Sequence, residues 1–255
     1  MRSQACPVVI LCGGLGTRIA DVSAGALPKP MLPIGGMPIL WHIMKLYSHQ
    51  GFNDFILCLG HLGDVIEDYF TRDSFEGRLV GYRDAGCNER WEPGWRITFA
   101  QTGELTPTGG RLKCVEQLIE EDSFMVTYGD GLSDVPLREL LSFHEDRTKT
   151  ATLTGVRARA AFGVMDVTEG VATSFVEKPL LDKRINGGFF VFQRNVFDYL
   201  TFEDPLEEAP LRRMVERREL AVYEHDGFWG CMDTKKDFEA LNAMWSSGQV
   251  PWKCW

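Results

Sequence analysis

The sequence contains no closely spaced pair of cysteines. Its seven cysteines are scattered through 255 residues without a Cys-x-x-Cys motif, and the five histidines lie apart from them. Zinc sites and disulfide frameworks both depend on regular cysteine spacing, so this pattern argues against either one. We expect reduced and mainly buried thiols, as in a cytoplasmic protein.

Long hydrophobic runs are also missing. No apolar stretch approaches the roughly 20 residues that a helix needs to cross a membrane. Residues 8–12 form a short apolar stretch that ends in glycines, without the small-residue cleavage pattern of a signal peptide. We therefore expect no membrane segment and no signal peptide.

Positive charge is not in excess, because the formal net charge is −9. A general nucleic-acid-binding protein presents a basic face, so we expect no nucleic-acid partner. Small anionic ligands remain compatible with this balance, because local lysines, arginines, backbone amides and a metal ion can bind them.

No proline- or serine-rich linker, internal repeat or low-complexity segment divides the chain, which favours a single domain over residues 1–255. Up to about residue 150, apolar runs of strand length alternate with helix-like segments. This order predicts an α/β fold with a Rossmann-like, mostly parallel sheet flanked by helices. The remaining part, residues 151–255, is β-rich and ends in a helix.

The expected elements follow this division. The expected strands are residues 8–12, 55–59, 97–100, 124–128, 151–156, 164–167, 171–176, 188–192 and 220–224. The expected helices are residues 39–49, 65–70, 112–120, 137–145, 196–200, 211–217 and 235–247.

Polar residues and glycines dominate residues 72–96, which we interpret as a surface insertion. Its Trp91 and Trp95 fit either a contact with a substrate or a neighbouring subunit, or plain surface packing. Other tryptophans are interpreted as core or interface residues and not as a ligand cage. They are Trp41, Trp229, Trp245, Trp252 and Trp255.

A glycine-rich stretch, Gly13-Gly14-Leu15-Gly16-Thr17-Arg18, follows the first expected strand. Glycines here allow positive φ and close backbone approach, so successive N–H groups can form an anion-binding nest. A tight turn without a ligand is the alternative. The dinucleotide fingerprint fails because its third glycine position is Ile19, and the Walker A loop fails because Gly16 precedes Thr17-Arg18.

Lys29 lies between Pro28 and Pro30, which hold the backbone extended and keep it out of a helix. A lysine fixed in this way near a phosphate loop favours charge neutralisation. An ordinary proline-rich loop is the alternative interpretation.

Taken together, these two motifs resemble the signature of sugar-phosphate nucleotidyltransferases, and further motifs follow in the same order. These are Thr108-Gly109-Gly110-Arg111, Tyr128-Gly129-Asp130-Gly131, Glu177-Lys178-Pro179, 185–190 and 228–234. Within that superfamily the set is most similar to the glucose-1-phosphate cytidylyltransferase family. The resemblance covers nearly the whole chain.

The resemblance implies a nucleotide-diphospho-sugar transferase fold, in which about residues 1–150 bind nucleotide and about 151–255 bind sugar. It implies CTP and a sugar 1-phosphate as substrates, Mg²⁺ as cofactor, and a homo-oligomer. Asp130 and Asp233 would bind the metal, and Arg18, Lys29, Asp130, Lys178 and Asp233 would be catalytic. The nucleotide-binding residues would be Leu11, Gly13, Gly14, Gly16, Thr17, Arg18, Lys29, Thr106, Gly110, Arg111 and Asp130. The substrate-binding residues would be Gly131, Gly163, Glu177, Lys178, Asn186 and Gly187.

The residues themselves suit this chemistry. Asp130 follows an expected parallel strand and lies between two glycines, at the sheet edge where α/β folds bind ligands. Two carboxylates from separate segments, with water and phosphate oxygens, suit the octahedral shell of Mg²⁺. A phosphate monoester loses its second proton with a pKa of about 6, so a sugar phosphate needs no general base as nucleophile.

Two alternatives stay open at this point. The first is the same chemistry with another base or with another phosphate or phosphonate acceptor, because base choice depends on hydrogen bonds that spacing does not reveal. The second is a regulatory subunit that binds nucleotide sugars without turnover. That interpretation expects loss of the metal carboxylates or the loop lysine, and Asp130, Asp233 and Lys29 are all present.

Overall fold

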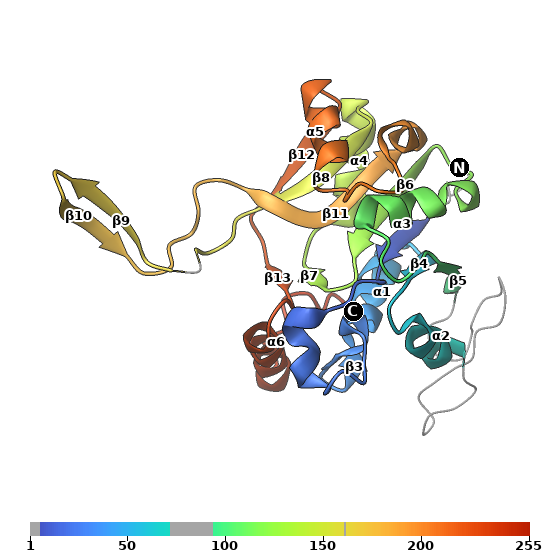
Figure 1. Cartoon of the computed structure of the whole chain (residues 1–255), viewed down its shortest axis with the longest axis horizontal. Coiled ribbons are helices and arrows are strands. Elements are labelled where there is room, and N and C mark those ends of the chain that lie inside the picture. Colours follow the sequence, from blue (N-terminus) through green and yellow to red (C-terminus); the bar gives the residue numbers. More distant parts are fainter. Residues whose placement is uncertain (1–5, 72–93, 161) are drawn as a thin grey trace.

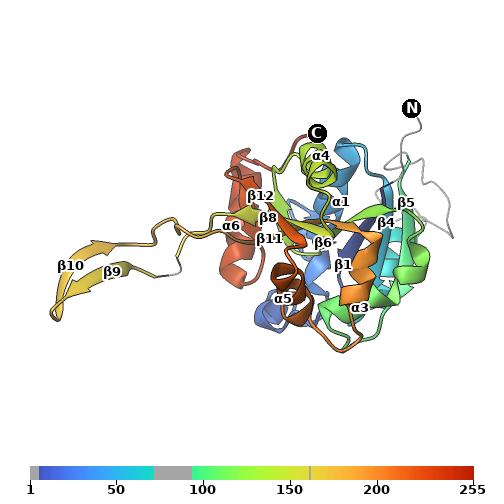
Figure 2. The ribbon, with the colours of Figure 1, turned by 90° about the horizontal axis from the view of Figure 1, so that it is seen from above.

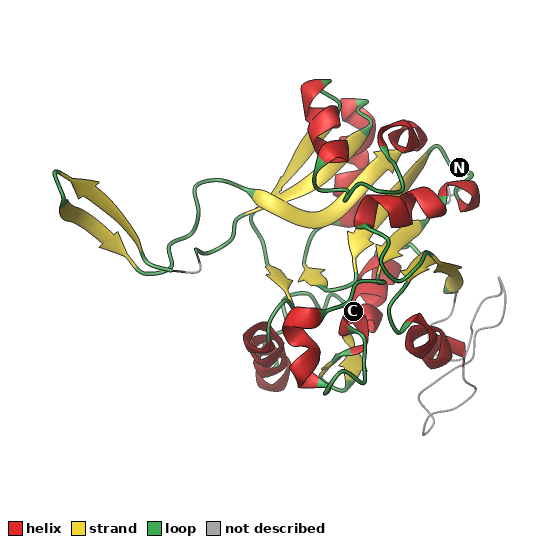
Figure 3. Ribbon diagram, viewed as in Figure 1, coloured by secondary structure: helices red, strands yellow, loops and turns green. Residues whose placement is uncertain are grey.

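One seven-stranded sheet organises the computed structural model, which describes residues 6–71, 94–160 and 162–255. The strand order is β12-β8-β11-β6-β1-β4-β5. Neighbouring strands are parallel except on both sides of β11, which runs antiparallel to β6 and β8. The prediction of a mostly parallel sheet flanked by helices is confirmed (Figure 3). The strands are β1 (Val8–Leu11), β4 (Asp54–Leu59), β5 (Arg96–Gln101), β6 (Ser123–Tyr128), β8 (Ala151–Val156), β11 (Ile185–Gln193) and β12 (Leu220–His225).

Helices cover both faces of this sheet, with α1 and α4 on one side and α3 and α5 on the other (Figure 2). Strand β1 shows the consequence, because Val8 and Ile10 belong to one apolar cluster while Val9 and Leu11 belong to the second. A strand buried on both faces consists of consecutive apolar residues, and this pattern predicted β1 from the sequence. The helices are α1 (Ile39–His49), α2 (Gly63–Thr71), α3 (Thr108–Cys114), α4 (Leu137–Arg147), α5 (Ala209–Glu216) and α6 (Lys235–Ser247).

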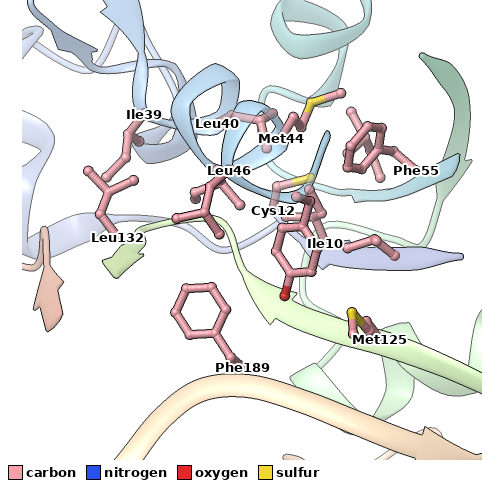
Figure 4. Packing of buried hydrophobic residues seen from close by; sticks show 14 of the residues in the cluster. Ile10, Cys12, Ile39, Leu40, Met44, Leu46, Phe55, Met125, Leu132 and Phe189 are labelled. Atoms are coloured by element: carbon pink, nitrogen blue, oxygen red, sulfur yellow. The ribbon is translucent and has the colours of Figure 1, made fainter. Parts of the chain in front are cut away.

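The larger apolar cluster lies between α1 and the sheet. Leu40 and Met44 of α1 meet Ile10 and Met125 of the central strands, and Phe189 of β11 extends the same layer (Figure 4). This packing fixes the central strands, and therefore the positions at which they end.

Two expected helices differ from the prediction. The helix expected at residues 112–120 begins earlier in the chain, at Thr108, and ends at Cys114 as α3. Only a 3₁₀ turn at Glu116–Leu118 follows it. Positions 109 and 110 of α3 require glycine because a loop packs against them. A Cβ added at Gly109 would lie 2.5 Å from the Asp204 carbonyl oxygen, and one added at Gly110 would lie 2.3 Å from the Phe202 carbonyl oxygen. The second expected helix, residues 196–200, is a 3₁₀ helix at Arg194–Tyr199.

Two expected strands leave the sheet entirely. β9 (Val164–Thr168) and β10 (Val171–Val176) pair with each other as an antiparallel hairpin. This hairpin, which we call the arm, projects away from the sheet and helices in both views (Figures 1 and 2). All residues of both strands are exposed.

Three short two-stranded pairings were not predicted. β2 (Pro33–Ile34) pairs with β3 (Met37–Pro38), and β7 (Gly131–Ser133) pairs with β13 (Trp229–Cys231). The arm is the third pairing outside the large sheet. The strands of the arm were expected but not their separation from the sheet, whereas the segments of the other two pairings are two or three residues long and too short to give a sequence signal.

The tryptophan side chains differ in their burial and in their contacts. Trp252 is fully buried, and the rings of Trp41, Trp245, Trp252 and Trp255 surround buried His42 at centroid distances of 5.0–6.3 Å. Trp229 instead donates an indole hydrogen bond to the Gly187 carbonyl oxygen. Trp95 is buried against Phe55, whereas Trp91 and the rest of 72–93 lie outside the described residues.

The cysteines of the described segments are all free. Cys12 and Cys58 are buried, but Cys114 and Cys254 are exposed, so the expectation of mainly buried thiols holds only in part. Within residues 6–71, 94–160 and 162–255, no helix is both long and apolar enough to span a bilayer.

Candidate active site

A pocket of about 330 Å³ opens at the carboxyl ends of β1 and β6. It combines the glycine-rich loop after β1, the Lys29 segment, the Gly129-Asp130 turn after β6, and Asp233. This is the sheet edge at which parallel α/β folds bind ligands. The lining residues are Leu11, Cys12, Gly14, Leu15, Gly16, Thr17, Arg18, Ile19, Lys29, Pro30, Gly129, Asp130 and Asp233.

Glycine is required at two positions of the loop. Gly16 has φ 60° and its added Cβ would lie 3.1 Å from Lys29 Cβ. Gly13 is not in the pocket lining; its added Cβ would lie 2.1 Å from an Arg111 nitrogen. The loop is therefore shaped by close approach of Lys29 on one side and Arg111 on the other.

Lys29 bridges the two aspartates predicted to bind metal. Its Nζ lies 2.6 Å from Asp130 Oδ2 and 2.5 Å from Asp233 Oδ1. Asp233 also pairs with Arg18 at 3.2 Å. Lys29 and Asp233, which are 204 positions apart in the chain, thus meet at one point.

The local backbone explains why Asp233 reaches Asp130. Pairing of β13 with β7 brings the two segments together, and the Met232 N–H donates to the Asp130 carbonyl at 2.9 Å. Asp237 completes a capping box with Thr234 at the start of α6 and also accepts a bond from the Asp233 N–H at 3.2 Å.

The charges of this cluster stabilise one another. Burial alone would lower the pKa of Lys29, but Asp130 and Asp233 outweigh it and raise that pKa above its ordinary value. Burial likewise opposes ionisation of Asp233, yet Lys29 and Arg18 hold its pKa below the usual range. The ammonium and the Asp233 carboxylate are therefore both ionised at neutral pH.

The two aspartates fit a divalent cation. Their carboxylates converge on the Lys29 ammonium, which shows that one positive charge can be held between both of them. Asp130, Cys231 and Asp233 offer ligand atoms within 4.8 Å of one another. Burial raises the pKa of the Cys231 thiol well above its usual value, so two hard carboxylate oxygens remain as ligands, which is a donor set suited to Mg²⁺.

Arg111 is buried, and the protein itself already binds its guanidinium. Its two terminal nitrogens lie 2.7–3.1 Å from five oxygens. These are the carbonyl oxygens of Gly13, Leu59, Gly103 and Glu104, and the hydroxyl of Thr102. The residue therefore fastens the glycine loop to the ends of β4 and β5, and neither it nor Gly110 or Thr106 lines the pocket.

The residues expected on the sugar side separate into two groups. Gly131 is buried in β7, and Asn186 and Gly187 lie in β11 beside Tyr128, whose hydroxyl accepts a bond from Asn186 at 3.2 Å. Glu177, Lys178 and Gly163 instead lie at the base of the arm, where Lys178 and Glu177 form an exposed pair at 3.4 Å. The structure does not bring this second group to the pocket of its own chain.

Some residues at the site escaped sequence reasoning. Cys12, Leu15, Ile19 and Pro30 line the pocket, and their positions within the glycine loop and the Lys29 segment were the available signal. Glu207 had no such signal in the sequence. Its carboxylate binds the hydroxyls of Thr108 and Tyr128, which precede it by 99 and 79 residues.

Comparison with known proteins agrees with this geometry. The family model described as nucleotidyl transferase matches residues 7–243. A glucose-1-phosphate cytidylyltransferase of Salmonella typhimurium is 42% identical over 255 residues, covering 97% of this chain and 98% of the relative. A Bacillus subtilis relative is also 42% identical, over 97% of this chain and 99% of its own length.

A solved structure supports the fold. HddC from Yersinia pseudotuberculosis has a TM-score of 0.69 at 24% identity and covers 94% of this chain and 99% of HddC. Because the alignment with the Salmonella cytidylyltransferase spans almost the entire sequence, this chain belongs to the nucleotidyl transferase family and, within it, to the glucose-1-phosphate cytidylyltransferases, a group of sugar-1-phosphate nucleotidyltransferases.

Proposed function

We propose that the protein transfers the cytidylyl group of CTP to α-D-glucose 1-phosphate, which yields CDP-glucose and pyrophosphate. The observation that carries this proposal is the convergence of Lys29, Asp130 and Asp233 beside the glycine loop, at distances of 2.5–2.6 Å. The choice of CTP and of glucose 1-phosphate is supported by the 42% identity to the Salmonella enzyme of that name.

The reaction is an in-line displacement in which a sugar-phosphate oxygen attacks the α-phosphorus and pyrophosphate leaves. We assign the triphosphate to the amides of Gly14, Gly16 and Thr17, with Arg18 and Lys29 neutralising its charge. The nucleophile is already ionised at neutral pH, so no histidine is needed as a base. Alignment and charge neutralisation then account for catalysis.

Asp130 and Asp233 would hold Mg²⁺, which when bound supplies positive charge to the phosphoryl oxygens. In this structure the Lys29 ammonium lies between the two carboxylates. Lys29 is therefore free to move onto a phosphate once another cation binds the aspartates.

The arm supports the proposal of a homo-oligomer. An isolated two-stranded hairpin is only marginally stable in water, yet the arm exposes Val164, Met165, Val167, Val171, Phe175 and Val176. Because Glu177 and Lys178 lie outside the pocket of their own chain, their proposed contacts with the sugar phosphate require the arm of a second copy. The chain would act as a single domain, with about residues 1–150 binding nucleotide and 151–255 binding sugar.

A cytoplasmic location fits the same proposal. Six described cysteines are free, and two of them, Cys114 and Cys254, are exposed. Exposed thiols persist in reducing compartments.

Pyrophosphate release tests the activity directly. Purified protein with Mg²⁺ is incubated with CTP, ATP, GTP, UTP or dTTP and a panel of sugar 1-phosphates and phosphonates. We expect CTP with α-D-glucose 1-phosphate to be the best pair. A preference for another base or acceptor would replace the proposed substrates, and no turnover with any pair would favour a regulatory subunit.

The Asp130→Ala variant tests the metal role. The side chain of Asp130 contacts Lys29 alone among described residues, so the fold should survive while turnover falls by about 10²–10³. Asp146→Ala, an exposed change on α4, is the control for loss of one carboxylate. If Asp130→Ala were as active as Asp146→Ala, the proposed role of Asp130 in metal binding would be wrong.

A further inference from the structure

A second polar network surrounds the hydroxyl group of Tyr128, two residues before Asp130. It joins Thr108 at the start of α3, Tyr128 at the end of β6, Asn186 in β11, and Glu207 in the loop before α5. Four segments that are distant in sequence therefore meet next to Asp130, which is two residues from Tyr128. Sequence motifs include three of these residues, and Glu207 is the addition that the fold makes.

The direction of each hydrogen bond can be assigned from the donors available. The backbone N–H of Leu206 donates to the Thr108 hydroxyl at 2.8 Å, so the hydroxyl hydrogen is left for Glu207 Oε2 at 2.7 Å. Tyr128 donates its single hydroxyl hydrogen to Glu207 Oε1. Both carboxylate oxygens of Glu207 are thus acceptors, as an ionised carboxylate requires.

The amide of Asn186 is oriented by the same reasoning. A backbone N–H can only donate, so the Asn186 atom that lies 2.9 Å from the Gly188 nitrogen is the oxygen Oδ1. The Nδ2 group then faces the Tyr128 oxygen at 3.2 Å and donates to it. This is consistent only because Tyr128 has given its own hydrogen to Glu207.

One hydrogen of Asn186 Nδ2 remains. Over residues 6–71, 94–160 and 162–255 it has no acceptor, since the described partners of this amide are Tyr128 and Gly188 alone. That hydrogen is therefore available to a ligand. Hydrogen bonds connect this part of β11 to both segments that carry the aspartates: Asn186 donates to Tyr128, two residues before Asp130, and the next residue, Gly187, accepts at 2.8 Å from Trp229, four residues before Asp233.

The backbone around Asn186 is shaped for this contact. The pairing of β11 with β8 shifts register between Asn186 and Phe190. Gly188 has φ 79°, and an added Cβ would lie 2.5 Å from the Tyr128 ring. Only glycine allows the ring and the bulged strand to come this close, so the Asn186–Tyr128 contact is built into the fold.

We propose that Glu207 positions Asn186 as a hydrogen-bond donor to a hydroxyl oxygen of the sugar 1-phosphate, acting through the Tyr128 hydroxyl. The inference rests on the proposed function. Glu207 is a positioning residue, because its carboxylate contacts Tyr128 and Thr108 and not the reacting groups. If Glu207 is lost, the Tyr128 hydroxyl hydrogen has no carboxylate acceptor and can turn toward Asn186 Nδ2, so the Nδ2–Tyr128 hydrogen bond weakens and the amide is held by the Gly188 N–H alone.

Variants of Glu207 test this arrangement. Glu207→Ala should lower kcat/KM for glucose 1-phosphate about tenfold, the effect of one lost hydrogen bond in the transition state. The KM for CTP should stay unchanged. Glu207→Gln keeps an oxygen that can accept from Tyr128 and should recover most of the loss. Glu208→Ala, one residue further along, removes the same charge without a described side-chain bond and is the matched control.

A double-mutant cycle separates positioning from general stabilisation. In a Tyr128→Phe background, Glu207→Ala should have no additional effect on kcat/KM for the sugar phosphate, because the linking hydroxyl is already gone. Additive losses would overturn the proposal. Thermal unfolding of each variant measures any loss of stability separately from the change in kcat/KM.

Substrate analogues test the donor assignment. Wild-type protein should discriminate strongly against one monodeoxy glucose 1-phosphate, and the corresponding monofluoro analogue, which can accept but not donate, should be used better. This difference should disappear in Glu207→Ala. If wild-type protein turns over glucose 1-phosphate but Glu207→Ala matches Glu208→Ala, the inference fails and the proposed function stands. Absence of wild-type turnover would instead reject the proposed function itself.

Discussion

Lys29 shows how one residue can serve two states of a site. In this structure its ammonium binds both aspartates, and the flanking prolines hold it close to the glycine loop. A lysine in this position competes with a metal ion for the same carboxylates. It would also be the nearest cation available to a bound triphosphate.

The Lys29→Met variant should therefore bind metal more tightly than wild type in the absence of nucleotide. We expect the affinity for Mn²⁺, measured by electron paramagnetic resonance, to rise about tenfold, because two charge-assisted hydrogen bonds no longer have to be broken. Turnover should fall, since phosphate neutralisation is lost.

Lys149→Met is the control for the change in net charge, because Lys149 pairs only distantly with Glu219, at 4.0 Å. Equal Mn²⁺ affinity in wild type and Lys29→Met would show that Lys29 does not compete with the metal.

Motif residues differed in how well the sequence predicted their surroundings. Lys29 was expected near the glycine loop and Asp130 at the ligand-binding edge of the sheet, and the two residues lie in contact. Arg111 belonged to an equally clear motif, yet its guanidinium binds five oxygens of the protein and lies outside the pocket lining. A motif identifies the residue type, whereas its partners depend on loops that are distant in sequence.

At the scale of elements, Arg111 of α3 fastens the carboxyl ends of β1, β4 and β5. Burial lowers the pKa of Arg111, but a guanidinium remains charged in proteins, and its two terminal nitrogens donate in two directions to the five surrounding oxygens. Arg111→Lys offers three donors to five oxygens. We expect the free energy of unfolding to fall by about 2 kcal/mol and the KM for CTP to rise, because buried acceptors lose their partners.

Urea denaturation and steady-state kinetics measure these two effects. Arg212→Lys, an exposed change on α5, is the control. An unchanged free energy of unfolding in Arg111→Lys would show that the loop and strand ends around residue 111 do not depend on the guanidinium group.

The arm is the element whose role depends most on a second molecule. Phe175 and Val167 are 62% and 60% exposed on a hairpin that touches little of its own chain. The double change Phe175→Ser and Val167→Thr should leave the fold of the sheet intact but reduce the number of associated subunits. Sedimentation velocity measures the association state, and circular dichroism checks the fold.

Ser174→Thr on the same hairpin is the control, and it should not alter association. An unchanged sedimentation coefficient in the double variant would contradict the proposed role of the arm. Reduced activity together with reduced association would agree with delivery of Lys178 to a neighbouring pocket.

At the scale of the whole molecule, two buried histidines set the response to acid. Burial lowers the pKa of His42 and that of His144 from 6.5 to about 4. His42 donates from Nε2 to the Ile34 carbonyl oxygen, and its Nδ1 has no partner in the described part of the chain, so protonation would bury an unpaired N–H. His144 is held between Thr152 and Gln193.

Stability should therefore fall as pH decreases from 6.5 to 4. In this window the unfolded chain binds protons at both histidines while the native protein does not, so the free energy of unfolding decreases. Each histidine should contribute a slope of about 1.2 kcal/mol per pH unit near pH 5. Urea denaturation at several pH values measures the slope.

The His42→Phe variant should reduce that slope by the contribution of one histidine, whatever its effect on absolute stability. His49→Gln is the control, because His49 is exposed at the end of α1. A slope equal to that of wild type in His42→Phe would contradict the assignment of His42 as a neutral buried residue.

The sequence by itself determined the fold class and the type of chemistry. Strands buried on both faces have continuous apolar runs, and the residue types at Gly13–Arg18, Lys29, Asp130 and Asp233 predict a phosphate and metal site. These signals are local, since each depends on a few consecutive residues and the backbone they dictate.

Only the tertiary structure decided which distant residues meet. Pairing of β7 with β13 brings Asp233 to Asp130, the arm carries Lys178 away from its own pocket, and the loop before α5 supplies Glu207 to Tyr128. These contacts depend on side-chain packing and hydrogen bonds between distant segments, such as Lys29 and Asp233, which are 204 residues apart. No periodicity or motif in one segment encodes the position of another, so folding had to bring them together.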